Sequence, residues 1–85
     1  MSDLQQRFEA AVAQSKNLPE RPDNVTLLKI YALYKQGTSG DATGPQPGLG
    51  DLVGRAKHDA WAQLKGTAKD DAMSQYVGLI DSLKD

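Results

Sequence analysis

Two pairs of side chains in this sequence have residue types and a spacing that could bind an anionic ligand. Tyr31 and Lys35 are four residues apart, and Lys57 and Trp61 repeat that spacing. Residues four apart share one face of a helix, so each pair sets an aromatic ring beside an ammonium group. Such groups, converging from different helices, could form a phosphate pocket with a ring to stack on a base. The plainer interpretation is core aromatics flanked by snorkelling lysines, and the residues taken alone favour it.

The residues give little support for catalysis or for a metal site. The chain has no cysteine, and its one histidine, His58, has no serine or thiol at a recognisable motif spacing. A zinc site would need mostly carboxylates, which is uncommon. Acidic residues such as Asp59, Asp70 and Asp71 are scattered along expected solvent-facing positions. We therefore expect no enzyme, no catalytic residue, no metal and no cofactor.

Length and charge narrow the class of ligand. The chain has 85 residues, and residues 1–85 are expected to form one domain and a monomer. Ten Lys and Arg against eleven Asp and Glu give a net charge of −1, whereas proteins that bind duplex nucleic acid usually present a broad basic surface. We therefore expect no nucleic-acid partner, and a compact anion met by a local cluster.

The composition also bears on location. No apolar run of about 18 residues predicts a membrane-spanning helix, so no stable membrane insertion is expected. The first residues show no basic stretch followed by an apolar one, as a secretory signal would. The absence of cysteine is compatible with a reducing compartment. The expected location is cytoplasmic.

Apolar residues recur at helical spacing in the first half of the chain. The pattern from Leu4 to Ser15 predicts a first helix, and the prolines of LPERP at 18–22 end it because proline lacks a backbone donor. Asp23 or Asn24 can cap a second helix, and Gly37 is its expected end. This second helix should lie centrally, because apolar residues cover more than half of its circumference.

A segment rich in glycine and proline separates this part from two further helices. Residues 37–50 contain five glycines and two prolines, and a loop of this length is usually functional or disordered. A third helix should end at Gly66, and Thr67 with Asp70 should cap a fourth that runs to Leu83. No segment predicts a strand, so the fold class is all-α: four helices with one long connection. The third helix has an apolar stripe of Leu52, Val53, Ala56, Ala60 and Leu64.

Longer motifs then favour the ligand-binding interpretation of the aromatic–lysine pairs. IYALYKQGTSGD at 30–41, Pro47–Gly48 followed by Asp51, and GRAKHDAWAQLKGTAKDDAM at 54–73 together resemble the acyl-CoA-binding protein family. The resemblance extends in order from Phe8 to about Leu83. It implies a small stand-alone four-helix bundle with up-down-down-up topology. It also implies an intracellular carrier and pool former that binds medium- or long-chain fatty acyl-CoA esters without covalent chemistry.

The resemblance further implies which residues contact the ligand. It assigns five residues to the coenzyme A head group, above all to its 3′-phosphate, and three to the adenine and acyl part of the cleft. Tyr34 and Trp61 match positions interpreted as mainly packing. The head-group residues are Tyr31, Lys35, Lys57, Tyr76 and Lys16, and the cleft residues are Ala11, Val12 and Leu28.

The chain departs from the family pattern at several positions. Val53 stands where many members have lysine, Leu52 where many have an aromatic residue, His58 where tryptophan is common, and Gly37 where alanine is usual. These departures are expected to alter affinity and chain preference. A different class of function, a helical protein–protein interaction module without affinity for acyl-CoA, is the alternative. Hydrolysis of the thioester ranks last, because no nucleophile or base supports it.

Overall fold

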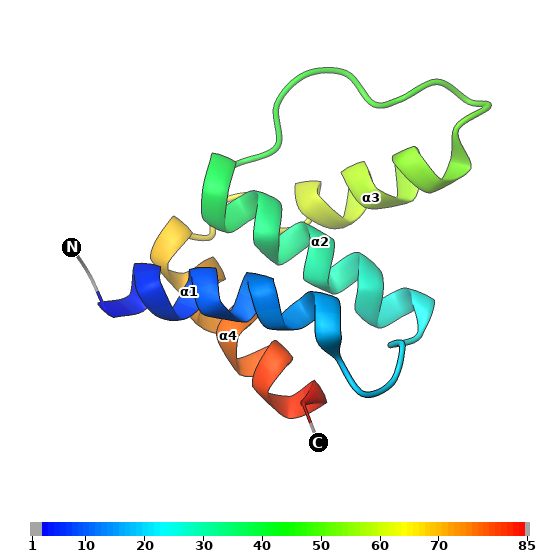
Figure 1. Ribbon diagram of the computed structural model, residues 1–85. Helices are drawn as coiled ribbons and strands as arrows, with labels where there is room; N and C mark the ends of the chain where they lie inside the picture. The colour runs from blue at the N-terminus through cyan, green and yellow to red at the C-terminus, as the bar shows by residue number, and fades with distance from the viewer. Residues whose placement is uncertain (1–2, 85) are drawn as a thin grey trace.

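The computed structural model describes residues 3–84, and this part of the chain is helical with no strand (Figure 1). Each of the four predicted helices is present, and a 3-10 turn follows the first of them. The all-α fold class is therefore confirmed. The elements are α1 (Asp3–Gln14), η1 (Ser15–Asn17), α2 (Asn24–Ser39), α3 (Leu52–Ala62) and α4 (Lys69–Leu83).

The directions of the helices explain the long connection. In Figure 1, α2 and α3 run the same way, whereas α1 and α4 run the opposite way, which is the up-down-down-up order. Neighbouring helices that run in parallel need a connection that returns the chain to its starting end. The loop between Ser39 and Leu52 does this by passing over α3.

The hydrophobic core is built by α1, α2 and α4. The Phe8 ring lies edge-on to Tyr76, with 5.1 Å between centroids, and stacks near Tyr34 at 6.1 Å. Burying aromatic rings of this size contributes much of a small core's stability. No residue of α3 is buried, and α3 packs on α2. The buried core residues are Phe8, Ala11, Leu33, Ala72, Met73, Tyr76, Val77 and Ile80.

The predicted start of α2 is confirmed, but its predicted end is wrong. Asp23 caps the helix by accepting a hydrogen bond from the Thr26 backbone N–H at 2.9 Å. The helix then continues through Gly37 to Ser39, and Gly40 ends it with a positive φ of 82°. Glycine is favoured there because a side chain rarely adopts this conformation.

Gly37 has a packing role inside α2. It is buried, and a Cβ placed on it would lie 3.2 Å from Cγ of Met73 and 3.5 Å from Cζ of Phe8. Glycine therefore allows α2 to approach α1 and α4 closely, which the reading of Gly37 as a helix end overlooked.

The predicted capping of the last helix is also wrong. The third helix ends at Ala62, and Gly66 lies in the turn after it with a φ of 92°. The first residue of α4 is Lys69, and its N-cap is Ala68, which makes no side-chain capping hydrogen bond. Thr67 instead contributes its backbone carbonyl to a buried polar cluster, because that oxygen accepts from Gln36.

This polar cluster ties the end of α2 to the turn between α3 and α4. Nε2 of the fully buried Gln36 donates to Oδ1 of Asp41 at 2.9 Å and to the carbonyl of Thr67 at 2.8 Å. The same Asp41 oxygen accepts from the Gly66 backbone N–H at 3.0 Å. The two hydrogen bonds that Asp41 accepts hold the pKa of its carboxyl below its usual value of 3.8. The bond from Gly66 has the larger effect, and the bond from Gln36 the smaller.

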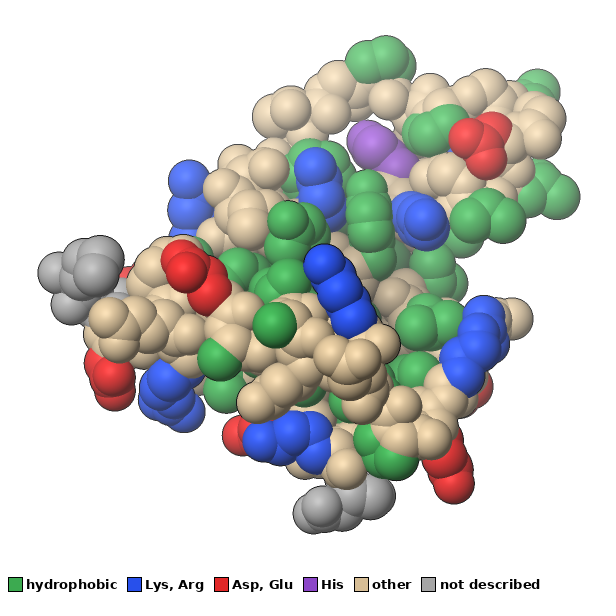
Figure 2. Space-filling view, viewed as in Figure 1, with side chains coloured by type: hydrophobic (Ala, Val, Ile, Leu, Met, Phe, Trp, Pro, Cys, Tyr) green, Lys and Arg blue, Asp and Glu red, His purple; other side chains and the backbone are tan. Residues whose placement is uncertain are grey.

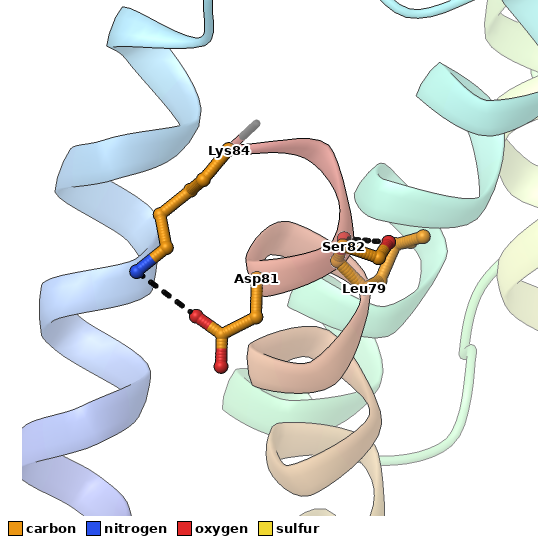
Figure 3. A network of polar contacts seen from close by, with 4 residues as sticks. All are labelled: Leu79, Asp81, Ser82 and Lys84. Carbon is orange, nitrogen blue, oxygen red and sulfur yellow. Dashed lines mark hydrogen bonds and ion pairs between the residues drawn. The ribbon is translucent and has the colours of Figure 1, made fainter.

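The end of α4 is held by local surface contacts. Lys84 Nζ pairs with Asp81 Oδ1 at 3.1 Å, and Ser82 Oγ donates to the Leu79 carbonyl at 2.6 Å (Figure 3). Exposed ion pairs of this kind contribute little to stability.

The lowered pKa of Asp41 predicts how acid affects stability. A carboxyl with a lower pKa in the folded state stabilises the fold above its unfolded pKa, and this contribution is lost as the pH falls through the folded pKa. Asparagine can accept the same hydrogen bonds but carries no charge. We therefore expect Asp41→Asn to lower the melting temperature above pH 3.8, with a difference from the wild type that shrinks at lower pH.

Thermal unfolding followed by circular dichroism between about pH 2 and pH 7 measures this difference across the relevant range. Glu20→Gln, at an exposed position of the α1–α2 connection, is the matched control. A difference between Asp41→Asn and wild type that stays constant with pH would contradict the prediction.

Candidate ligand-binding site

A pocket of about 790 Å³ lies between α2 and α3, with further walls from α1, η1 and α4. Figure 2 shows hydrophobic side chains gathered in the hollow between the part of the molecule formed by α3 and its loop and the rest, with Lys and Arg side chains beside them. We call this cavity the main pocket. Its lining residues are Val12, Ser15, Arg21, Asn24, Leu27, Leu28, Ile30, Tyr31, Tyr34, Leu52, Val53, Ala56, Lys57 and Tyr76.

The two aromatic–lysine pairs meet across the contact between α2 and α3. Lys57 Nζ of α3 lies 5.3 Å from the centroid of the Tyr31 ring of α2. Conversely, Lys35 Nζ of α2 lies 5.0 Å from the Trp61 ring of α3. Each ammonium group is within cation–π distance of the other helix's ring. The expectation that the pairs converge from separate helices is met, although each lysine contacts the opposite pair's ring.

The two ammonium groups remain free to bind an anion. Among residues 3–84, neither Lys35 nor Lys57 forms a salt bridge with a carboxylate. The Lys57 side chain is exposed and lines the main pocket, whereas Lys35 is half-buried and does not line it. An ammonium group can donate three hydrogen bonds, so this end of the pocket suits a phosphate.

Trp61 also fastens the long loop to α3. Its Nε1 donates to the Gly40 carbonyl at 2.8 Å, and Arg55 Nη1 donates to the Pro47 carbonyl at 3.2 Å. Gln46 donates to Asp59 in the same region. The position of α3, and with it the position of Lys57, therefore depends on contacts made by the loop.

Tyr76 forms the inner wall of the main pocket. Only 2% of its surface is exposed, and burial raises the pKa of its phenol, an effect that a side-chain hydrogen bond with Ser15 partly opposes. The raised pKa keeps the phenol protonated. Tyr34 lies beside it, with 6.4 Å between ring centroids, and is 39% exposed. The packing role expected for Tyr34 thus omits its place on the pocket wall.

Aliphatic side chains of α2 and α3 form a large part of the lining of the main pocket. They are Leu27, Leu28 and Ile30 of α2 and Leu52, Val53 and Ala56 of α3. Leu52 and Val53 are 75% and 66% exposed. These two residues of the predicted apolar stripe of α3 thus line a pocket that is open to solvent.

The structure brings together most of the predicted site residues. Tyr31, Lys57 and Tyr76 line the main pocket together with Val12 and Leu28.

The remaining predicted site residues lie elsewhere. Lys35 lies next to the pocket, against Trp61. Lys16 is exposed on η1 and is not a lining residue, although Ser15 before it is. Ala11 does not line the pocket, because its methyl group points into the core and is only 3% exposed.

Three polar lining residues, Ser15, Arg21 and Asn24, are not among the predicted site residues. Arg21 and Asn24 come from the connection between η1 and α2 and from the first turn of α2, and Arg21 Nη2 is 3.4 Å from Asn24 Oδ1. No periodic pattern could have found Arg21, since it belongs to an irregular connection, and Asn24 was predicted only as a possible helix cap. The prolines on either side of Arg21 were the only local signal, and they predicted the end of the first helix and gave no indication of a pocket wall.

The lining of the main pocket suits the binding of a ligand. His58 does not line the main pocket, and neither of its ring nitrogens has a hydrogen-bond partner among the described residues. Within residues 3–84 no three His, Cys, Asp or Glu side chains are grouped so that they could hold a metal ion. In the same range no helix is both long and apolar enough to span a bilayer. The main pocket combines aliphatic walls with ammonium, guanidinium and phenol groups.

Comparison with known proteins identifies close relatives of this chain. The family model described as Acyl CoA binding protein matches residues 5–80. Acyl-CoA-binding protein homolog 1 of Caenorhabditis elegans is 53% identical over 76 residues, which are 89% of this chain and 88% of that protein. Enoyl-CoA delta isomerase 2 of Rattus norvegicus is 47% identical over 83 residues, which are 98% of this chain and 21% of that longer protein.

Solved structures agree with these sequence matches. The crystal structure of Oryza sativa Acyl-CoA-Binding Protein 2 matches with a TM-score of 0.90 and 39% identity, over 94% of this chain and 87% of that one. The solution structure of Acyl Coenzyme A Binding Protein from yeast matches with a TM-score of 0.74 and 41% identity, over 92% and 91% of the two chains.

The exclusion of α3 from the core predicts its dynamics. Since no residue of α3 is buried, opening this helix exposes little apolar surface, and amide exchange should be fast there. We expect amides of α3 to exchange at least about tenfold faster than those of α4, measured by hydrogen exchange with NMR detection. Exchange in α3 as slow as at the buried positions Ala72 to Ile80 of α4 would contradict this expectation.

Proposed function

Because the chain belongs to the acyl-CoA-binding protein family, we propose that it is a carrier and pool former for fatty acyl-CoA esters and that the main pocket is its binding site. The observation that carries this assignment is the polarity of the pocket. Ammonium and phenol groups of Lys57, Tyr31 and Tyr76 line it together with aliphatic side chains of α2 and α3, and Lys57 lies over the Tyr31 ring. An acyl-CoA ester likewise combines phosphate groups with a hydrocarbon chain.

The head group, above all its 3′-phosphate, is assigned to the contact between α2 and α3. Tyr31 and Lys57 lie together there, and Lys35 is held beside them by Trp61. Tyr76 supports the same end with a phenol that stays protonated. Lys16 is placed in this group by the family resemblance, and its support is the neighbouring Ser15, which lines the pocket.

The adenine and acyl parts are assigned to the apolar walls. Val12 and Leu28 line the pocket and support this assignment. Ala11 belongs to the layer behind Val12, where it holds α1 in the core.

The magnitudes are sufficient for tight binding by a protein of nearly neutral charge. Each buried methylene contributes about 0.8 kcal/mol, so a long chain supplies most of the preference over free coenzyme A. A hydrogen bond between a charged lysine and a phosphate adds about 1.5–3 kcal/mol. Two or three local ammonium groups therefore suffice, and a net charge of −1 is no obstacle.

The proposal is a carrier without enzymatic activity. The rat isomerase named above is more than four times as long as the part that matches this chain, so its activity is not carried over. The pocket residues include no nucleophile paired with a base. A monomer of one domain, in the cytoplasm and without a nucleic-acid partner, completes the proposal.

The rival function, an interaction module without acyl-CoA affinity, makes a different prediction about ligand. A ligand that binds only the folded state raises the melting temperature by mass action. A thermal shift with oleoyl-CoA is expected for the carrier and none for the interaction module.

Substitution of the head-group residues is the direct test of the site. We expect Lys57→Ala and Lys35→Ala each to weaken palmitoyl-CoA binding about 10- to 100-fold, because each removes a charged hydrogen-bond donor. Tyr31→Phe should weaken it less, because only a neutral hydroxyl is lost. Isothermal titration calorimetry measures the affinities, with circular dichroism to confirm the fold.

The matched control is Lys65→Ala, an exposed lysine in the turn after α3 that does not line the main pocket. Unchanged affinity in Lys57→Ala and Lys35→Ala would rule out the proposed phosphate site.

Removal of the phosphate from the ligand tests the same contact from the other side. We expect the ester of 3′-dephospho-coenzyme A to bind wild type at least about tenfold more weakly than the palmitoyl-CoA ester does. Lys57→Ala should bind the two esters with more similar affinities, because its phosphate contact is already lost. Equal binding of both esters by wild type would show that the site does not centre on this phosphate.

A further inference from the structure

A second pocket of about 460 Å³ lies on the other side of the contact between α2 and α3. Its floor is apolar, and includes Ala32 and Leu33, each 3% exposed. Its four polar lining residues are all exposed and therefore lie at its rim: Lys29, Asp59, Gln63 and Gln75. The floor suits a hydrocarbon and offers no charge to an ionic ligand.

The second pocket is separated from the main pocket by two side chains. Leu28 of α2 and Ala56 of α3 line both cavities. The lining of the main pocket also includes the aliphatic side chains of Leu27, Leu52 and Val53. The two cavities therefore adjoin at a leucine and an alanine.

The separating side chains can move at little cost. Leu28 and Ala56 are both half-buried and lie outside the core cluster, and α3 contributes no buried residue. A small displacement of α3 from α2, or another rotamer of Leu28, exposes little apolar surface. In contrast, an apolar chain that passes between the two helices gains burial on both sides, and its affinity rises about fourfold for each methylene that is taken out of water.

We propose that the terminal part of a long acyl chain passes between Leu28 and Ala56 into the second pocket, and that Ala60 in that pocket limits the length of chain accepted. This inference rests on the proposed function and adds the chain-length determinant. A short chain ends in the main pocket and does not reach Ala60. Chain-length preference is then set by residues that line only the second pocket, such as Ala60 and Leu79.

The first test measures how affinity depends on the length of the acyl chain when a larger side chain partly fills the second pocket. Ala60→Leu adds volume in the second pocket, and Ala62→Leu adds the same atoms to an exposed position of α3 that lines neither pocket. Octanoyl-, palmitoyl- and eicosanoyl-CoA are titrated calorimetrically into wild type and both variants.

We expect Ala60→Leu to bind octanoyl-CoA as wild type does and to bind eicosanoyl-CoA about tenfold more weakly, or more. Ala62→Leu should match wild type at every length. A loss in Ala60→Leu that is the same at all lengths, or no loss at any length, overturns the inference.

A second measurement, on the wild-type protein, does not depend on the folding of any variant. Stearoyl-CoA carrying a nitroxide near the methyl end is bound, and broadening of backbone amide signals is recorded by NMR. We expect the strongest broadening at Ala60, Leu64 and Leu79, whereas a nitroxide near the thioester should broaden residues of the main pocket. Broadening confined to the main pocket for both labels would overturn the inference. Binding of no ester at all would instead overturn the proposed function.

Discussion

The close packing of α2 against α1 and α4 is the constraint on which the rest of this structure depends. Gly37 lets the helices approach, and Phe8, Tyr34 and Tyr76 fill the space between them with aromatic rings. This core is complete without α3. The third helix contributes no buried residue and packs mainly on α2. The two cavities lie along this contact. If α3 were buried in the core as the other three helices are, these cavities would be closed.

The polar contacts compensate for this weak attachment of α3. Trp61, Arg55 and Asp59 each bind the loop that passes over the helix, and the cluster around Gln36 fixes both the start of that loop and the turn that follows the helix. The two cation–π contacts also hold α3 on α2, and they involve Lys35 and Lys57, the two lysines proposed to bind the phosphate. A bound phosphate would contact ammonium groups on both helices, so the ligand would strengthen the same contact that positions its own binding residues.

Sequence patterns predicted the helices, the fold class and the two aromatic–lysine pairs, because these depend on local spacing. They failed where tertiary contact overrides a local signal: Gly37 resembles a helix end but serves close packing, and Thr67 resembles a cap but contributes a carbonyl to Gln36. Leu52 and Val53 belong to the apolar stripe that the sequence predicts, but their exposure in the lining of a pocket came only from the structure. The place of Arg21 in that lining could not be foreseen, since the path of an irregular connection is decided by the elements that it joins. The family resemblance supplied roles for residues; the arrangement of Lys57 over Tyr31 and Lys35 over Trp61 came only from the structure.

Two of the departures from the family pattern, Leu52 and Val53, line the main pocket and can therefore affect binding. They replace an aromatic residue and a lysine common in the family, and most of their surface is exposed. A ligand chain that covers them removes that apolar surface from water, a gain that grows with the length of the chain. A lysine at Val53 would instead contribute a charge that does not depend on chain length. On the proposed function, the valine would shift the balance of binding from the head group toward the acyl chain, and Lys57, one helical turn further along α3, would keep the proposed phosphate contact.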